Sequence, residues 1–356
     1  MAVVEALTGR TVVADGKELL YFSGTSYLGM CKNSQLEAII QEGAKRYGTT
    51  YSSSRNSNLK LAVYDEAEEL LAALAGAEAA LTFSSGYLAG QALIRTISKG
   101  QAFIYAPDAH PAIWQSAADA NHVDFDLWVE SLAESINACS GEVVLLMNSV
   151  DPLKARKYDF SWVAQLPVNR SITLIVDDSH GFGLINEGAG IYPTLKQLVK
   201  PNVALIVVGS MGKALGIAGG VVMGPARIIA LLRKSPYFIG GSPAPPAYLY
   251  AFIHAQNIFA TSRQQLKRNV QQFQQLVRHT GLFNYFDDYP VFYTKEHNLY
   301  FALEEDAIIS CFPYPDPESA PVTRVVINSL HTSGDISFLA EKIEKFRVGE
   351  KMIKRV

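Results

Sequence analysis

Cysteine, long apolar runs and an excess of charge are all scarce in this sequence. Its 356 residues include only three cysteines, Cys31, Cys139 and Cys311, which are far apart and form no CxxC pair. This spacing argues against a disulfide framework or a cysteine-based metal or redox centre, and predicts three buried thiols in a reducing compartment. No stretch of about 20 apolar residues is present, so we expect no membrane span.

The charges nearly balance, with 31 lysines and arginines against 34 aspartates and glutamates, for a formal net charge of −3. This balance gives no reason to expect nucleic acid or an anionic membrane as a partner. The N-terminus lacks a basic segment followed by an apolar run, so we expect no signal peptide and a cytoplasmic location. Hydrophobic residues make up 49% of the chain, and its length predicts a large domain plus a smaller one.

Short apolar runs alternate with helical stretches through the middle of the chain. Predicted strands lie at 80–83, 103–105, 142–147, 172–176 and 203–208. Because these runs are apolar on both faces, they suit a sheet that is covered on both sides. The alternation predicts the α/β class, with a mostly parallel sheet in a large domain covered by helices and a smaller α+β C-terminal domain.

The two ends of the chain show other patterns. Two strand-like runs around Asp15-Gly16 predict a hairpin over residues 11–22. Apolar residues at helical spacing predict helices at 35–47, 61–75, 247–277 and 335–346. A Gly- and Pro-rich segment predicts a loop at 235–246. Two short runs predict strands at 298–303 and 322–327. We therefore predict three parts. Residues 1–45 form an N-terminal hairpin and helix that pack on the small domain, and residues 46–240 form the large domain. Residues 241–356 form a linking helix and the small C-terminal domain.

Polar residues follow several predicted strands, and in an open parallel sheet ligands bind beyond the carboxyl ends of the strands. Asp177 follows the strand at 172–176, and His180 lies three residues further on. Lys213 follows the strand at 203–208 and is flanked by small residues. A nucleotide phosphate loop of the form GxxxxGK followed by Ser or Thr is not indicated, because the glycine spacing differs and Ala214 replaces the hydroxyl.

Two further strands are followed by candidate site residues. Ser85, Gly86 and Tyr87 open a helical run, where free backbone N–H groups and the helix dipole suit a phosphate, although Ser is also an ordinary N-cap. His110 follows the strand at 103–105, where a lone histidine is more often structural. The informative feature is the ordered set: a phosphate-binding turn, a His, an Asp with a His, and a Lys, all at strand ends.

This set resembles the fold-type I pyridoxal phosphate-dependent enzymes of the class I/II aminotransferase superfamily. It is most similar to the α-oxoamine synthase group, which includes 8-amino-7-oxononanoate synthase and 2-amino-3-ketobutyrate ligase. The resemblance extends from about residue 11 to residue 346, and several motifs in register make it specific. The stretches that carry it are Tyr27-Leu28-Gly29, 66–70, 85–87, 108–110, 177–190 and Ser210-Met211-Gly212-Lys213.

The resemblance implies pyridoxal 5'-phosphate as cofactor and a catalytic role for four residues. Lys213 would form the Schiff base with the cofactor aldehyde and move protons to and from the substrate. Asp177 would pair with the pyridine nitrogen and keep it protonated. His180 would hydrogen-bond the ring oxygen O3′, and His110 would stack on the ring.

The resemblance also implies how the cofactor phosphate is held. Ser85, Gly86 and Tyr87 would contribute backbone and hydroxyl donors, and Ser210 would add a hydroxyl. In this group a hydroxyl of the second subunit also reaches the phosphate, and Ser242 is the matching candidate. A homodimer with shared sites is therefore implied, with no metal.

Several positions depart from the group's pattern, and they cluster on its substrate side. The arginine that binds the substrate carboxylate is replaced by Val326, two residues after Arg324. Valine cannot replace a bidentate guanidinium. Residues 148–156 lack the acidic, serine-containing stretch of the synthases. Tyr64 stands where a histidine is common, and Thr25-Ser26 stands where Asn-Asp is usual.

Three functional hypotheses follow. The first is an α-oxoamine synthase, resembling 8-amino-7-oxononanoate synthase, that condenses an amino acid with an acyl-CoA and loses CO2. The second is an aminotransferase of class I/II acting on a small amine or amino acid, which the altered residues 148–156 and Val326 favour. The third is a non-catalytic binding protein on this fold, against which Lys213 argues. The substrate is not named by the sequence, and Arg55, Arg156 and Arg324 are candidate carboxylate anchors.

Overall fold

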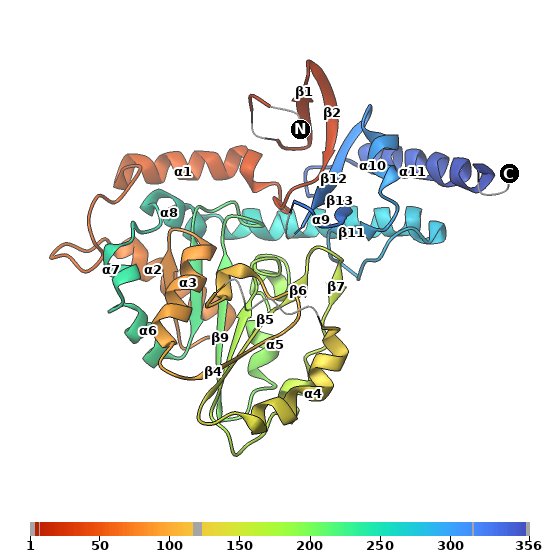
Figure 1. The fold of residues 1–356 in the computed structure, drawn as a ribbon. Helices are drawn as coiled ribbons and strands as arrows, with labels where there is room; N and C mark the ends of the chain where they lie inside the picture. The colour runs from red at the N-terminus through yellow and green to blue at the C-terminus, as the bar shows by residue number, and fades with distance from the viewer. Residues whose placement is uncertain (1–3, 7, 117–122, 315–316, 354–356) are drawn as a thin grey trace. The chain divides into compact units, whose positions relative to one another are not determined.

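The computed structural model describes residues 4–6, 8–116, 123–314 and 317–353, and divides the chain into two compact units (Figure 1). The small unit consists of residues 1–34, 151–157 and 257–356, and the large unit consists of residues 35–150 and 158–256. The sequence pattern places the first helix in the N-terminal part at 1–45, whereas the structure groups residues 35–47 with the large unit. It also assigns residues 241–256 to the large unit, because their helix packs there.

The large unit is built on a six-stranded sheet with the order β3-β10-β9-β8-β5-β4. Its four central and edge strands from β9 to β4 run parallel, and β10 is antiparallel to both of its neighbours. The predicted mostly parallel sheet is therefore confirmed. In spatial order the strands are β3 (Ala79–Phe83), β10 (Gly220–Gly224), β9 (Val203–Ser210), β8 (Ile172–Asp177), β5 (Val143–Asn148) and β4 (Ala102–Tyr105).

Helices cover this sheet and bury its apolar strands. All six residues of β8 are buried, as are the first five of β5, which explains why these strands are apolar without alternation. Leu81, Leu93 and Ile206 belong to one continuous core. The helices of this unit are α1 (Ser34–Tyr47), α2 (Ala62–Ala75), α3 (Gly86–Ile97), α4 (Phe125–Ala138), α5 (Tyr192–Lys196), α6 (Ala226–Leu232), α7 (Pro236–Gly240) and α8 (Pro246–His254).

The small unit contains a five-stranded sheet with the order β1-β2-β12-β13-β11. The N-terminal hairpin turns at Asp15 and Gly16, both with positive φ, and β2 continues the sheet by pairing parallel to β12. The elements are β1 (Thr11–Ala14), β2 (Lys17–Phe22), β11 (Val291–Thr294), β12 (Ala307–Pro313), β13 (Pro321–Val326), α9 (Gln256–Val277), α10 (Asn298–Leu303) and α11 (Ser333–Ile353). A two-stranded ribbon joins β6 (Val150–Asp151) to β7 (Arg156–Lys157).

Three predicted elements differ from the structure. The predicted strand at 298–303 is wrong, because this segment is helix α10, which buries Leu299 and Leu303 one helical turn apart. The predicted loop at 235–246 contains the short helix α7. Ser235 caps this helix, its hydroxyl accepting from the Phe238 N–H at 3.2 Å.

The predicted single helix at 247–277 consists of two helices. The chain leaves helical geometry at Ala255 (φ −99°, ψ 12°), so that α8 ends at His254 and α9 begins at Gln256. No proline or glycine marks this break in the sequence. The division between the two units falls at the same place, because residue 256 is the last of the large unit.

Candidate active site

The predicted site residues gather at the carboxyl ends of neighbouring strands in the large unit. Asp177 ends β8, and the register pairs it with Asn148 of β5 on one side and with Val208 of β9 on the other. Ser210 ends β9, and Gly220 of β10 pairs with it. Because parallel strands end at one edge of the sheet, side chains that follow them face a common region.

Lys213 and His180 come together in this region. Lys213 Nζ lies 2.9 Å from His180 Nε2, within hydrogen-bonding distance, although 33 residues separate them in the chain. The turn that carries Lys213 is closed by the Met211 N–H, which donates to the Gly219 carbonyl at 2.9 Å. Both residues are half-buried.

Asp177 and His110 form a second pair. His110 Nδ1 lies 3.6 Å from Asp177 Oδ2, and the Asp177 side chain is 6% exposed. His110 Nδ1 also accepts from the Ala112 N–H at 3.1 Å, which leaves a proton for Nε2 in the neutral ring. Burial lowers the pKa of His110, Asp177 opposes this shift, and the positive charge of Lys213 adds to it. His110 is therefore held neutral beside a buried carboxylate.

The predicted phosphate turn has a form that suits an anion. Ser85 is the N-cap of α3, with its hydroxyl accepting from the Leu88 N–H at 3.1 Å. Gly86 follows, and a Cβ at this position would lie 2.8 Å from Cα and Cβ of Ser210, so only glycine allows β9 to approach so closely. The start of α3 offers backbone donors that have no intrahelical acceptor. Tyr87 is 58% exposed.

Ser179 and Asn148 are site residues that the prediction did not single out. The Ser179 N–H donates to Asp177 Oδ1 at 2.9 Å, and its hydroxyl accepts from the Ser210 N–H at 3.0 Å, which ties β8 to the end of β9. Asn148 ends β5 and bonds to the segment that carries His110. Both could have been found by reading the last residue of each strand as well as those that follow it.

Ser242 does not join this group within one chain. It is exposed and lies between α7 and α8, and no hydrogen bond among the described residues links it to the other predicted site residues. Its predicted role depends on a second subunit and is not tested by a single chain.

Two of the candidate carboxylate anchors are engaged elsewhere. Arg55 is buried and donates to both oxygens of Glu68, at 2.6 and 3.2 Å. Arg324, 5% exposed in β13 of the small unit, donates to the Pro152 carbonyl, and its guanidinium lies 5.6 Å from the Phe312 ring centroid. Both guanidinium groups therefore have structural partners.

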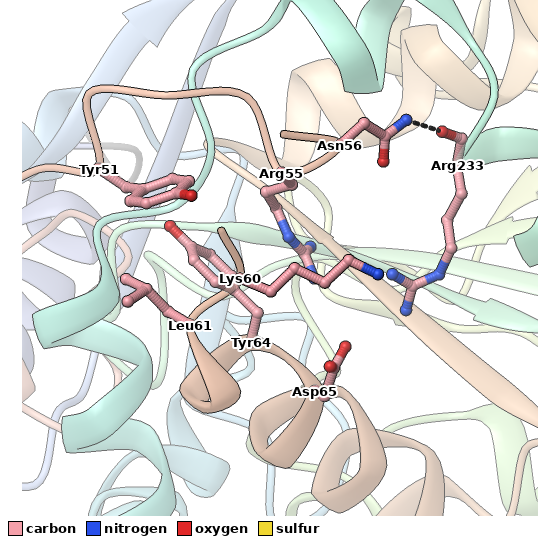
Figure 2. Close-up of a pocket in the computed structure, with 8 residues that line it drawn as sticks. All are labelled: Tyr51, Arg55, Asn56, Lys60, Leu61, Tyr64, Asp65 and Arg233. Atoms are coloured by element: carbon pink, nitrogen blue, oxygen red, sulfur yellow. Dashed lines mark hydrogen bonds between the residues drawn. The ribbon is translucent and has the colours of Figure 1, made fainter. Parts of the chain in front are cut away.

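Arg55 and Tyr64 line a separate pocket of about 100 Å³ (Figure 2). Arg55 lies over the Tyr64 ring, 4.3 Å from its centroid, and the Tyr64 hydroxyl donates to the Ala244 carbonyl at 2.8 Å. Burial raises the pKa of Tyr64. Arg233 also forms an ion pair with Glu68, at 2.6 Å. This arrangement fixes Tyr64 by contacts with the backbone and with Arg55, where the synthase pattern has a histidine.

Within the described ranges, no group of three or more His, Cys, Asp or Glu side chains could hold a metal ion. The same part of the chain contains no helix that is both long and apolar enough to cross a membrane.

The chain is similar to a known enzyme family and to several curated proteins. The family model for aminotransferase class I and II matches residues 17–343. The chain is similar to the 8-amino-7-oxononanoate synthase of Thermosipho melanesiensis, with 24% identity over 98% of this chain and 93% of the relative. It is also similar to the enzyme of that name from Pseudomonas savastanoi, with 26% identity over 96% of this chain and 90% of the relative.

Solved structures share the fold. A serine palmitoyltransferase from S. paucimobilis superposes with a TM-score of 0.82 and 19% identity, covering 100% of this chain and 94% of that one. An 8-amino-7-oxononanoate synthase from Francisella tularensis superposes with a TM-score of 0.73 and 23% identity, covering 94% of this chain and 99% of that one. At these identities the likeness shows a common fold.

Proposed function

Because the chain belongs to the class I and II aminotransferase family, we propose that this pyridoxal phosphate-dependent transferase condenses an amino acid with an acyl thioester and releases CO2. This is the reaction type of the α-oxoamine synthases. The observation that supports the proposal most directly is the distance of 2.9 Å between Lys213 Nζ and His180 Nε2. This contact follows the carboxyl ends of the strands, where β8 ends at Asp177. The two relatives named 8-amino-7-oxononanoate synthase support the reaction type.

The residues of the site fit pyridoxal phosphate on structural grounds. The close approach of Gly86 to Ser210 leaves the start of α3 and a serine hydroxyl beside one another, as a phosphate ester requires. A buried carboxylate, Asp177, lies at the same edge and suits a protonated pyridine nitrogen. Lys213 offers a half-buried primary amine. These residues would hold the phosphate, the ring and the aldehyde carbon of the cofactor.

The chain's own residues account for the proton movements that the reaction needs. When bound, pyridoxal phosphate supplies an aldehyde that bonds to amines and a ring that draws electrons from the substrate α-carbon. Lys213 Nζ, as a neutral amine, would accept the α-carbon proton and later return one. Asp177 would keep a negative charge at the ring nitrogen. His110, neutral at Nδ1, would pack on the ring without adding charge.

Transamination by the same residues is the alternative reaction. It needs Lys213 and Asp177 but no acyl thioester, and the altered residues 148–156 and Val326 are consistent with it. We prefer the synthase reaction because the two relatives described above are named synthases, and each aligns with more than nine-tenths of this chain. An acyl-CoA and an amino acid are accordingly the proposed substrates.

A homodimer completes the proposal. Ser242 is exposed, and so are the apolar side chains of Leu59, Tyr237 and Ile239, at 65%, 37% and 42%. The segment before Leu59 and helix α7 are joined by Ser54, whose hydroxyl donates to the Ile239 carbonyl at 2.9 Å. A second copy on this face would bury these side chains and bring Ser242 to its active site. The cytoplasmic location and the absence of a nucleic-acid partner stay predictions.

Absorbance spectroscopy with a thiol-release assay tests the proposal. Purified protein is loaded with pyridoxal phosphate and compared with Lys213→Ala and with Lys99→Ala, a control that removes an exposed lysine from another part of the chain. We expect a visible absorbance band in the wild type and the control, and none of that type in Lys213→Ala. With a panel of amino acids and acyl-CoA thioesters, we expect free CoA thiol only when both substrates and Lys213 are present.

Two other results would contradict the proposal in different ways. In the first, an amine alone converts the visible band to that of the amine form of the cofactor. If this happens and no combination of amino acid and acyl-CoA releases thiol, the reaction is transamination. A protein that gives no Lys213-dependent band at saturating cofactor would show that the site keeps the fold without the chemistry.

A further inference from the structure

Asn148 joins the end of β5 to the segment that carries His110. Its side-chain Oδ1 accepts from the His110 N–H at 3.0 Å, and its Nδ2 donates to the Asp108 carbonyl at 2.7 Å. The strand register sets Asn148 beside Asp177. One amide side chain therefore contacts the backbone on both sides of Ala109, using both its acceptor and its donor.

The segment that Asn148 contacts has a strained backbone. Asp108 adopts a φ of +57°, in the left-handed region that is strained for a non-glycine residue. The turn is otherwise closed by the Ala109 N–H, which donates to the Ala106 carbonyl at 3.3 Å, a long hydrogen bond. A conformation of this kind persists only where the surroundings hold it. The two hydrogen bonds from Asn148, at 3.0 and 2.7 Å, are both shorter than the one from Ala109, and Trp114 Nε1 adds a third contact by donating to the Ala109 carbonyl at 2.7 Å.

The backbone of this turn decides where the His110 ring lies. The His110 N–H is fixed by Asn148, while ring atom Nδ1 accepts from the Ala112 N–H at 3.1 Å and lies 3.6 Å from Asp177 Oδ2. The charged groups that act on the ring are Asp177 and Lys213. Since Asn148 is uncharged, it holds the turn without adding a second negative charge beside Asp177.

We propose that Asn148 is a positioning residue of this active site: it fixes the turn that carries His110 and thereby holds that ring beside Asp177. A carboxylate could accept from the His110 N–H but could not donate to the Asp108 carbonyl. Aspartate is therefore a poor substitute despite its equal size. Asn148 acts through His110 and not by touching the reacting atoms.

Asn202 provides a matched control. Its Nδ2 donates to the Pro167 and Arg170 carbonyls, at 2.8 and 2.7 Å, so it too bridges two backbone groups. It precedes Val203, the first residue of β9, and so lies at the amino end of the strands, opposite to the site. A role that is only structural predicts that Asn148→Ala and Asn202→Ala behave alike.

The first test measures the pKa of His110 directly, in cofactor-free protein labelled with ¹³C in its histidine rings. A His110→Gln variant assigns the resonance, and the pKa is read from its titration in wild type, Asn148→Ala, Asn148→Asp and Asn202→Ala. We expect the lowered pKa of His110 to rise toward its usual value in Asn148→Ala, because a loosened turn lets the ring, which is 40% exposed in the folded protein, move further into water. In Asn148→Asp the new negative charge should raise it by about one unit.

Asn202→Ala should leave the pKa of His110 as in the wild type. The inference is overturned if neither Asn148 variant moves this pKa, or if Asn202→Ala moves it equally. Because Asn148→Asp has the same size as asparagine, it keeps the test decisive even if Asn148→Ala does not fold. This titration uses no cofactor and no substrate, so its outcome does not depend on the proposed reaction.

A second readout rests on the proposed function. Pyridoxal phosphate affinity, measured from the visible band, should weaken roughly tenfold in Asn148→Ala. This factor corresponds to losing the net free energy of one typical hydrogen bond. The Asn202→Ala protein should bind the cofactor as the wild type does. If His110 titrates as expected while the cofactor affinity is unchanged, Asn148 positions the ring but His110 does not contribute to cofactor binding, which refutes the functional half of the inference.

Discussion

Ionisation of the buried Asp178 carboxyl should destabilise the folded protein as the pH rises. Asp178 follows Asp177 and is fully buried, with Oδ2 accepting from the Ile191 N–H at 2.7 Å. Gly181 and Gly190 make room for it, because a Cβ at either position would lie 2.2 or 2.0 Å from a carboxylate oxygen. Besides the Ile191 N–H, the Ser149 side chain also favours the charged form, but burial outweighs both. An ionised carboxylate is therefore poorly compensated here.

Burial raises the pKa of Asp178 from 3.8 to about 7; the Ser149 side chain and the Ile191 N–H oppose this shift, and the neighbouring Asp177 charge adds to it. Because the folded state holds the proton more tightly than the unfolded state, stability is greatest below about pH 4 and falls as the pH rises to about 7. The full difference corresponds to about 4 kcal/mol, of which roughly 1 kcal/mol is lost between pH 6 and pH 8.5.

Asp178→Asn should remove this loss, because an amide keeps a carbonyl for the Ile191 N–H and carries no charge. The assay is thermal unfolding of the cofactor-free wild type and variant at a series of pH values from about 6 to 8.5. We expect the Tm of the wild type to fall relative to that of the variant as the pH rises. Parallel curves, or a variant that becomes relatively less stable at high pH, would refute an ionising buried carboxyl at this position.

Two further predictions concern a glycine and a helix cap. Gly86→Ala should abolish the visible cofactor band, because its Cβ would lie 2.8 Å from Ser210, whereas Gly240→Ala, with no atom within 4 Å, should retain it; equal bands in both variants would contradict the close approach. Asp335→Asn should lower the free energy of unfolding by about 1 kcal/mol by weakening the cap of α11 and the contact with Arg10. Since these donors lower the pKa of Asp335 to about 2, this stability should be lost as the pH falls from about 4 to 2, and an acid-unfolding curve unaffected by the substitution would argue against it.

The positions of Asp177, His180 and Lys213 in the fold followed from the sequence alone. Each is preceded by a short apolar run, and such a run marks a buried strand whatever the rest of the chain does. In a parallel sheet, being next to the end of a strand is enough to place a residue at the ligand-binding edge. The order of motifs along the chain therefore indicated the family, and it predicted a candidate site whose residues lie at the strand ends.

Contacts between distant segments were decided only by the tertiary structure. The guanidinium of Arg55 forms an ion pair with Glu68, and Glu68 also pairs with Arg233, which lies 165 residues further along the chain than Glu68. No local sequence pattern could therefore have excluded Arg55 as an anchor for a substrate carboxylate. Likewise, residues 298–303 have a composition that suits a strand or a helix, and packing of α10 selected the helix.

The sequence by itself determined the sheet, the strand ends and the chemical groups placed there, because these depend on local hydrophobic runs and on residue identity. Only the tertiary structure decided how those groups are held. The amide of Asn148 reaches Asp108 and His110 across about 40 residues of chain, and the carboxyl of Asp178 lies against the Ile191 N–H. Such contacts depend on the distance between segments after folding, and a linear pattern of residues does not specify that distance.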